Sequence, residues 1–299
     1  MIDKPGIYLS HKPVGVTSFS VVRTFIDEVA RSGGRKLPVC HGGTLDPFAE
    51  GLLLMLVGQA TRLMDLIHEV PKTYVAEVEW GAETDNGDLL GRVVHSADPS
   101  GLDPDQLEAA LTPFLGWTEQ VPPSTSAKKV GGEPAYKKVH RGEEVTLPPS
   151  RVFLHHARWL SHQLPVRSRL ALTVRGGFYV RSLARDLGRA IGCGAHLSAL
   201  RRTEIGPWAD PGPKQRGWVH GEGLLPWCAS RPLTDDEAGK LRREEPIPGG
   251  ALRAPSWNAP PGFPAPQGPI RALHRGLLVG LLRKEADTLV PEVVLRGGL

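Results

Sequence analysis

Hydrophobic positions along the chain follow the spacing of strands in some segments and of helices in others. Alternating apolar and polar residues over Thr73–Trp80 predict a strand with one buried face, and the unbroken apolar run Leu52–Val57 predicts a fully buried strand. Apolar residues three and four positions apart after Ser18 predict a helix that this serine caps. Asp103 and Pro104 favour the first turn of another helix, because Asp accepts amide hydrogen bonds there and Pro lacks an amide proton.

The same spacings predict further elements before the last quarter of the chain. They are strands at Ile7–Ser10 and Arg169–Arg175, helices at Ala60–Ile67 and Val180–Ala190, and a long polar loop at Pro122–Tyr136. Strands and helices are mixed without strict alternation, which indicates the α+β fold class rather than a doubly wound sheet.

The composition and periodicity of the chain change after about Pro226. Residues 242–269 are rich in proline and glycine and lack periodicity. Short apolar runs then predict strands at Ile270–Leu273, Leu277–Arg283 and Leu289–Leu295. We therefore predict a large domain at residues 1–228 and a small β-rich domain at residues 229–299.

Basic residues gather in short clusters. The net charge is +4 and the isoelectric point is near 9.0, values that many classes of protein share. The clusters lie beside glycine-rich and aromatic-bearing segments, which favours a surface that follows nucleic-acid phosphates over a set of solvated faces. They are Arg31–Lys36, Lys128–Lys129, Lys137–Arg141, Arg181 with Arg185, and Arg201–Arg202.

Several classes of protein do not fit this sequence. No apolar stretch reaches the roughly 18 residues of a membrane span, and Met1–Pro5 lacks the layout of a secretory signal. The three cysteines are too few for a disulfide framework. Zinc would require Cys40–His41 and Cys193–His196 to converge, and adjacent Cys and His side chains chelate one ion poorly. We expect a cytoplasmic protein without a metal site and without a membrane partner.

One carboxylate stands in an unusual setting. Asp46 follows Gly42 and Gly43, whose backbones can approach a ligand closely. Pro47 fixes its own backbone and biases Asp46 towards an extended conformation, just before a buried strand. From this pattern alone, a rigidly held catalytic carboxylate and a plain Asp–Pro turn are equally good interpretations.

The segment His41–Leu53, continued by Gly58–Arg62, resembles the signature of the TruB family of pseudouridine synthases. Other segments resemble the remaining motifs of that family in the expected order, and the resemblance covers about Ile7–Pro207. These segments are Lys12–Ser18, Lys72–Tyr74 with Thr84–Asp85, Pro122–Ala127 with Lys129, Gly132 and Tyr136, and Gly177–Leu183 with Gly192–Leu197 and Leu200–Arg202.

The resemblance implies catalytic roles for three residues. Asp46 matches the catalytic aspartate of the family, which either attacks the nucleotide or stabilises charge as the glycosidic bond breaks. Arg181 matches the arginine that keeps this carboxylate ionised and aimed. Tyr74 matches the tyrosine that stacks on the target base. Without the resemblance, Arg181 would be read as a surface helix residue and Tyr74 as a core residue.

Further residues match positions that bind the substrate. Tyr179 and Leu200 would line the base pocket beside Tyr74, and each alone would be read as a core residue. His41 would stack in the RNA after the target nucleotide has been extruded, because a planar side chain can fill that vacancy. Asp88 would hydrogen-bond the pocket.

We also expect direct RNA contacts from three basic residues that lie in these motifs. These residues are Lys12, Lys129 and Arg202.

The sequence departs from the family pattern at a few positions. Cys40 replaces a usual glycine, Phe178 replaces a small or hydroxylated residue, and the loop Thr84–Gly91 is less acidic than usual. The last of these departures weakens the assignment of Asp88. None of them affects Asp46, Tyr74 or Arg181.

The activity implied by the resemblance is isomerisation of the T-loop uridine at position 55 of tRNA, with no cofactor. The implied fold is a catalytic domain on a mixed, mainly antiparallel sheet, followed by a PUA-like RNA-binding domain that resembles its family only faintly. We expect a monomer that acts on the T-arm of free tRNA without an obligatory protein partner. An RNA-folding protein with incidental catalysis and a guide-RNA-dependent synthase are the alternatives.

Overall fold

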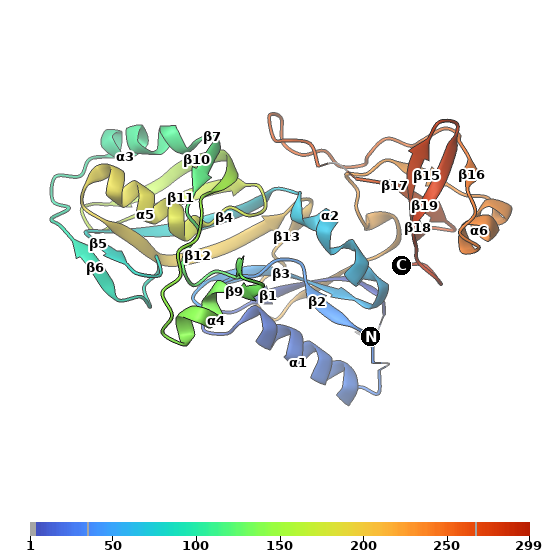
Figure 1. The fold of residues 1–299 in the computed structure, drawn as a ribbon, viewed down its shortest axis with the longest axis horizontal. Coiled ribbons are helices and arrows are strands. Elements are labelled where there is room, and N and C mark those ends of the chain that lie inside the picture. The colour runs from blue at the N-terminus through green and yellow to red at the C-terminus, as the bar shows by residue number, and fades with distance from the viewer. Residues whose placement is uncertain (1–3, 35, 267) are drawn as a thin grey trace.

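The computed structural model describes residues 4–34, 36–266 and 268–299, so Met1–Asp3, Arg35 and Gln267 lie outside the described residues. The start of the N-terminal segment and one arginine of the first basic cluster are therefore not described. Within these ranges the chain forms a ten-stranded sheet, a five-stranded sheet and two short hairpins (Figure 1). The predicted α+β class is confirmed.

The large sheet is mixed and mainly antiparallel, as predicted. The pair β3–β12 is parallel, and the other pairs assigned in this sheet are antiparallel. The strands in spatial order are β14 (Arg216–Val219), β1 (Gly6–Lys12), β3 (Glu50–Val57), β12 (Ala195–Ile205), β4 (Lys72–Trp80), β11 (Arg167–Val174), β10 (Ser150–Gln163) and β7 (Gly116–Gln120), with β2 (Val39–His41) beside β3 and β13 (Trp208–Ala209) beside β12.

Helices cover both halves of this sheet. Helix α1 (Ser18–Arg31) packs Phe25 and Val29 on β1 and β3. Helices α3 (Pro104–Leu111) and α5 (Val180–Ile191) bury their apolar stripes on β4, β11 and β12. Figure 1 shows α1 on one side of the sheet region and α3 with α5 at the other end.

Shorter elements connect these layers. They are η1 (Gly58–Leu63), α2 (Met64–His68), η2 (Thr112–Phe114), α4 (Ala135–His140), η3 (Gly221–Gly223), and the hairpins β5 (Ala82–Thr84) with β6 (Val93–Ser96) and β8 (Lys129–Val130) with β9 (Glu133–Pro134).

The structure refines several predicted boundaries. Thr17, rather than Ser18, caps α1, because its side chain accepts the amide hydrogen bond of Ser20. The predicted cap Asp103 is confirmed by its hydrogen bond from the Gln106 amide. The predicted loop Pro122–Tyr136 contains the β8–β9 hairpin and the start of α4.

The C-terminal sheet contains the predicted strands. Its order is β15 (Ser230–Pro232), β17 (Ile270–His274), β18 (Leu277–Glu285), β19 (Thr288–Val294) and β16 (Ile247–Pro248), with α6 (Asp235–Arg242) packed beside it. One hydrophobic cluster joins this sheet to the large one, since Leu278 and Leu295 pack with Ile7 and Leu56. The two sheets therefore share buried apolar surface.

Among the described residues, none of the helices has the length and apolar character needed to cross a membrane.

Candidate active site

The loop that carries Asp46 lies between β2 and β3 and is held by a set of short hydrogen bonds. The Ser18 hydroxyl accepts from the Leu45 amide and donates to the Leu45 carbonyl, both at 2.9 Å. The Gly15 amide donates to the Pro47 carbonyl at 2.8 Å. These contacts bracket Asp46 on both sides, so the segment Lys12–Ser18 holds the loop that carries Asp46.

Two of the basic residues expected to contact RNA are buried beneath this loop. Lys12 is fully buried, and its Nζ donates to the carbonyls of Pro13 at 2.9 Å and Val16 at 2.8 Å. Arg202 is 1% exposed and donates to the carbonyls of Leu52, Thr44 and Gly43. We expected both residues to contact RNA, but backbone carbonyls in the interior already use both charges, and of the two residues Arg202 also lines the cavity. Burial lowers the pKa of Lys12 to about 8.

Arg181, in the first turn of α5, forms an ion pair with Asp46. Its Nη2 donates to Asp46 Oδ1 at 3.0 Å, and its Nε lies 3.0 Å from Oδ2, although this second contact lacks hydrogen-bond geometry. The guanidinium is 4% exposed and also donates through Nη1 to the Asn86 carbonyl and the Thr125 hydroxyl, both at 2.8 Å. With these partners the arginine has little freedom, so it fixes the direction of the carboxylate.

The ionisation of Asp46 reflects opposing influences. Burial raises its pKa, the Arg181 guanidinium lowers it, and the negative charge of Asp88 raises it again. The net shift is upward from the ordinary value of 3.8. Because 29% of the side chain is exposed, the carboxylate remains accessible to a ligand in the cavity above it.

Asp88 lies behind Arg181 rather than in the cavity. Its Oδ2 is 3.8 Å from Arg181 Nη1, and its Oδ1 accepts hydrogen bonds at 2.9 Å from the Leu90 amide and from Asn86 Nδ2. This position corrects the expectation that Asp88 binds the substrate. Its carboxylate organises the loop and places a second negative charge beside the arginine.

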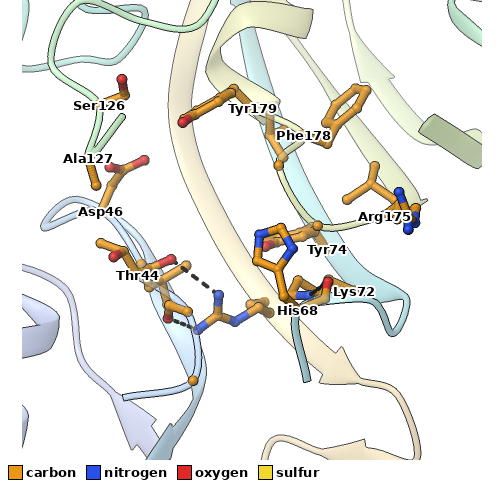
Figure 2. A pocket seen from close by; sticks show the side chains of 18 of the residues that line it. Thr44, Asp46, His68, Lys72, Tyr74, Ser126, Ala127, Arg175, Phe178 and Tyr179 are labelled. Atoms are coloured by element: carbon orange, nitrogen blue, oxygen red, sulfur yellow. Dashed lines mark hydrogen bonds between the residues drawn. The ribbon is translucent and has the colours of Figure 1, made fainter. Parts of the chain in front are cut away.

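A cavity of about 410 Å³ opens above Asp46. The sequence-predicted residues His41, Tyr74, Tyr179 and Leu200 all line it. Figure 2 shows Asp46, Ser126 and Ala127 on one side and Arg175 with Phe178 on the other, with Tyr74 and His68 between them. The structure thus brings together residues that four separate segments of the chain supply.

The aromatic walls of the cavity are held from outside. Both backbone groups of Tyr179 bond the Gln120 side chain, with the amide donating to Oε1 at 2.8 Å and the carbonyl accepting from Nε2 at 3.0 Å. Burial raises the pKa of Tyr179, so its hydroxyl stays protonated at neutral pH. Tyr74 is 8% exposed on β4 and contributes a nearly buried ring.

His41 stands at the cavity with its ring neutral and partly free. Burial, followed by the nearby Arg202 charge, lowers its pKa. Its Nδ1 atom is buried and has no hydrogen-bond partner among the residues that the structure describes. The residue lines the cavity, so its uncharged ring can contact a ligand bound there.

Lys129, the third basic residue expected to contact RNA, lies at the surface. It begins β8 and follows Ser126 and Ala127, which line the cavity. Its side chain is exposed, so direct RNA contact remains open to it.

Several residues of the site had no role in the sequence analysis. Thr125 holds Arg181, and Lys72, His68 and Arg175 line the cavity. Lys72 and Thr125 lie inside segments that resemble the family motifs, so the sequence could have indicated both residues. His68 and Arg175 carry no local signal, because only the contact between the end of α2 and the turn after β11 brings them to the site.

The cysteine–histidine pairs considered for zinc are engaged separately. His196 Nδ1 contacts the Ala82 carbonyl at 2.9 Å, and the Cys193 thiol donates to the Gly194 carbonyl at 3.3 Å. Within the described ranges, no three or more His, Cys, Asp or Glu side chains are grouped so as to hold a metal ion.

This arrangement defines a class of enzyme. A carboxylate fixed by a buried guanidinium, under a cavity with aromatic walls, suits nucleophilic or electrostatic catalysis on a flat polar group such as a nucleobase.

Comparison with known proteins identifies the family. Residues 34–180 match the model "TruB family pseudouridylate synthase (N terminal domain)", and residues 181–217 match "tRNA pseudouridylate synthase B C-terminal domain". The chain is 40% identical over 208 residues to tRNA pseudouridine synthase B of Bordetella pertussis, covering 68% of this chain and 82% of that one. It is 41% identical over 206 residues to the protein of that name from Xanthomonas campestris pv. campestris, covering 69% and 65%. The chain belongs to the TruB family of pseudouridine synthases.

Solved structures agree on the fold. A Cbf5–Nop10–Gar1 complex contains a chain that matches 98% of this one with a TM-score of 0.67, 20% identity and 85% of that chain covered. A chain from an H/ACA RNP bound to a substrate RNA containing 2′-deoxyuridine matches 98% of this one with a TM-score of 0.65, 17% identity and 86% of that chain covered. The fold expected from the resemblance is confirmed.

Proposed function

We propose that this protein is a tRNA pseudouridine synthase that converts the T-loop uridine at position 55 to pseudouridine in the cytoplasm. Membership of the TruB family and the names of its relatives support action on tRNA. The observation that carries the proposal is the Asp46–Arg181 ion pair beneath a cavity lined by Tyr74, Tyr179 and Leu200. This set provides a fixed carboxylate and aromatic and apolar walls for one base.

The target uridine must leave the RNA stack before it can reach Asp46. A base inside a folded loop is not accessible to a carboxylate at the floor of a cavity, so the nucleotide is extruded into that cavity. We assign to His41 the role of occupying the position that the base leaves, and its place at the lining of the cavity together with its lowered pKa supports this role.

The reaction rearranges bonds without net oxidation. The bond between C1′ and N1 breaks, the uracil turns, a bond forms between C1′ and C5, the C5 proton leaves, and N1 gains a proton. Asp46 serves either as a nucleophile or as the group that stabilises positive charge on the sugar. Both routes require the ionised carboxylate, and Arg181 favours that form.

The residues that line the cavity have separate roles in this proposal. Tyr74 stacks on the base and offers its hydroxyl as a proton donor or acceptor. Leu200 and Tyr179 confine the detached uracil so that it can turn without escaping. Lys129 contacts the RNA backbone at the rim, and the C-terminal sheet offers further surface for the tRNA. The residues assigned to the site belong to one chain, which supports a monomer that acts without an obligatory protein partner.

The test is tritium release from tRNA labelled at uracil C5, with wild-type protein and Asp46→Asn side by side and with neither cofactor nor guide RNA. We expect release by the wild type alone, while Asp46→Asn binds the same tRNA with unchanged affinity. Comparable turnover by Asp46→Asn would exclude the role proposed for this carboxylate. Failure of the wild type, with binding intact, would favour an RNA-binding protein or a guide-dependent enzyme.

A second measurement tests the position. Uridine at position 55 is replaced by cytidine in the same transcript, and all other uridines carry the label. Loss of release is the expected outcome, and continued release would place the reaction at another uridine.

A further inference from the structure

A cluster of aromatic and basic side chains lies beside the cavity, at the edge of the large sheet. Trp117 is on the edge strand β7 and is 43% exposed. The guanidinium of Arg151, on β10, lies 4.5 Å from the centre of its ring, and that of Arg175 lies 5.6 Å away. These three residues are called the tryptophan platform below.

The platform is backed by a row of buried rings. Trp117 pairs with Phe153 in the β7–β10 register, and their ring centres are 5.1 Å apart. Phe263 packs edge-on against Phe153 at 5.8 Å and is 6% exposed. Phe263 belongs to the segment between β16 and β17, which Figure 1 shows extending from the C-terminal sheet towards the large one. The platform is therefore fixed from behind by a distant part of the chain.

The platform is continuous with the active site. Arg175 lines the cavity and also touches Trp117, so one side chain belongs to both. Arg175 is paired with Glu69. Arg151 is exposed and stands opposite Glu119 in the β7–β10 register, but it forms no ion pair within the described part of the chain.

Two uses of such a cluster can be compared. Exposed charges near the edge of a sheet discourage pairing with other sheets, and a single arginine there would suffice for that purpose. An exposed indole beside guanidinium groups from β10 and from the residue after β11 offers more, since it combines exposed aromatic surface with positive charge that suits phosphate oxygens. Proteins that bind unpaired RNA combine these two features.

We propose that the tryptophan platform binds the RNA strand that flanks the target uridine outside the cavity. Arg151 binds a backbone phosphate, Arg175 holds the platform to the wall of the cavity through its pairing with Glu69, and the exposed edge of Trp117 contacts an unpaired base next to the extruded nucleotide. This inference rests on the proposed action on tRNA, and it assigns a contact that lies outside the motifs of the sequence.

The experiment measures tRNA binding and turnover for Arg151→Gln, Trp117→Leu and a matched control, Arg158→Gln. Arg158 is also exposed on β10 and lies seven residues further along, roughly 23 Å from Arg151. The substrate is an isolated T-arm hairpin, and the dissociation constant is measured at several salt concentrations beside kcat at saturating RNA.

We expect Arg151→Gln and Trp117→Leu each to weaken binding about tenfold, with kcat unchanged. The slope of log Kd against log salt concentration should be smaller for Arg151→Gln, by about the amount that one phosphate contact contributes. Arg158→Gln should match the wild type. Equal affinity and salt slope for Arg151→Gln, Arg158→Gln and wild type would overturn the platform while wild-type turnover still supports the proposed function. Absence of wild-type turnover would count against the function, and the binding series would still decide the platform. Arg151→Gln leaves the ring row intact, so a folding defect in Trp117→Leu does not remove the test.

Discussion

At the scale of single residues, Arg181 connects the carboxylate of Asp46 to the segments around it. It contacts Asp46, the Asn86 carbonyl and Thr125 from the first turn of one helix. The same charge lowers the pKa of Asp46 against the effect of burial. One side chain thus both orients the carboxylate and favours its ionised form.

Replacing Arg181 with Gln should raise the pKa of Asp46 further, because burial and Asp88 would then act without the opposing charge. A raised carboxylate pKa means that the active, ionised form is lost at higher pH as the solution is acidified. We expect the acidic limb of kcat/KM to move to higher pH and the maximal rate to fall about 100-fold. The measurement is a pH–rate profile on labelled tRNA. An acidic limb at the same pH in both proteins would contradict this account.

At the scale of secondary-structure elements, the start of β3 fits tightly against β12. Gly51 has a φ of +108°, and a β-carbon there would lie 2.2 Å from the Arg202 carbonyl oxygen. This close approach allows the parallel pairing of Gly51 with Arg202 just after the Asp46 loop. Glycine at this position therefore determines how the end of the Asp46 loop meets β12.

Gly51→Ala should separate β3 from β12 and lower both stability and activity. Positive φ and a steric clash with backbone act together, so we expect a loss of about 2 kcal/mol or more in the free energy of unfolding. Urea unfolding and tritium release measure the two effects. Gly142→Ala is the control, since Gly142 has a φ of +78° but open space around it. Equal losses in the two variants would assign the effect to backbone strain alone.

The end of helix α2 depends on a buried amine, that of Lys72. Lys72 Nζ donates to the carbonyls of Ile67 at 3.4 Å, His68 at 3.0 Å and Val70 at 3.2 Å, and so satisfies the end of α2, which forms a wall of the cavity. Burial, and then the Arg202 charge, lower the pKa of Lys72 to about 7.

Lys72→Met should lower the free energy of unfolding at pH 7 by about 1–3 kcal/mol, because buried carbonyls lose their donor. Between pH 7 and 10.5 the unfolded chain binds a proton at Lys72 that the folded chain releases. The wild type therefore gains stability from this group as pH rises through that window, and the variant does not. Urea unfolding at pH 7 and pH 9, with the exposed Lys137→Met as control, should show a difference that widens with pH. A constant difference would exclude the titration of Lys72 as its cause.

At the scale of the whole molecule, the two sheets share one hydrophobic cluster. Leu278 of the C-terminal sheet and Leu295, which follows its strand β19, pack with Leu56 of the large sheet, and Trp227 lies in the same cluster. Hydrogen bonds add to this junction, with Gln59 donating to the Arg296 carbonyl and Arg62 to the Val294 carbonyl. Shared buried surface favours cooperative unfolding of the two parts.

Leu278→Ala should test this coupling. The side chain is fully buried, so its loss should cost about 2–5 kcal/mol and lower the single midpoint of thermal unfolding for the entire chain. Leu277→Ala, at a neighbouring residue that is 38% exposed, should change the midpoint little. Two separate transitions, with only one moved by Leu278→Ala, would show that the C-terminal sheet unfolds independently.

The sequence alone determined those features that depend on near neighbours. The alternation over Thr73–Trp80 predicted strand β4, and Asp103 with Pro104 predicted the start of α3, because side-chain spacing and helix caps are local properties. The order of motifs also indicated the TruB family. The roles of Asp46, Tyr74 and Arg181 remain proposals, although the structure places all three at one site.

Only the tertiary structure decided which charged groups face solvent and which hold the interior. Lys12 and Arg202 look like RNA-binding residues in the sequence, yet they are buried and bond backbone carbonyls near Asp46. Arg175 and Phe263 carry no motif, but they meet the cavity and the tryptophan platform through packing between distant segments. The physical reason is that burial and charge pairing depend on which segments pack together, and a pattern of neighbouring residues does not contain that information.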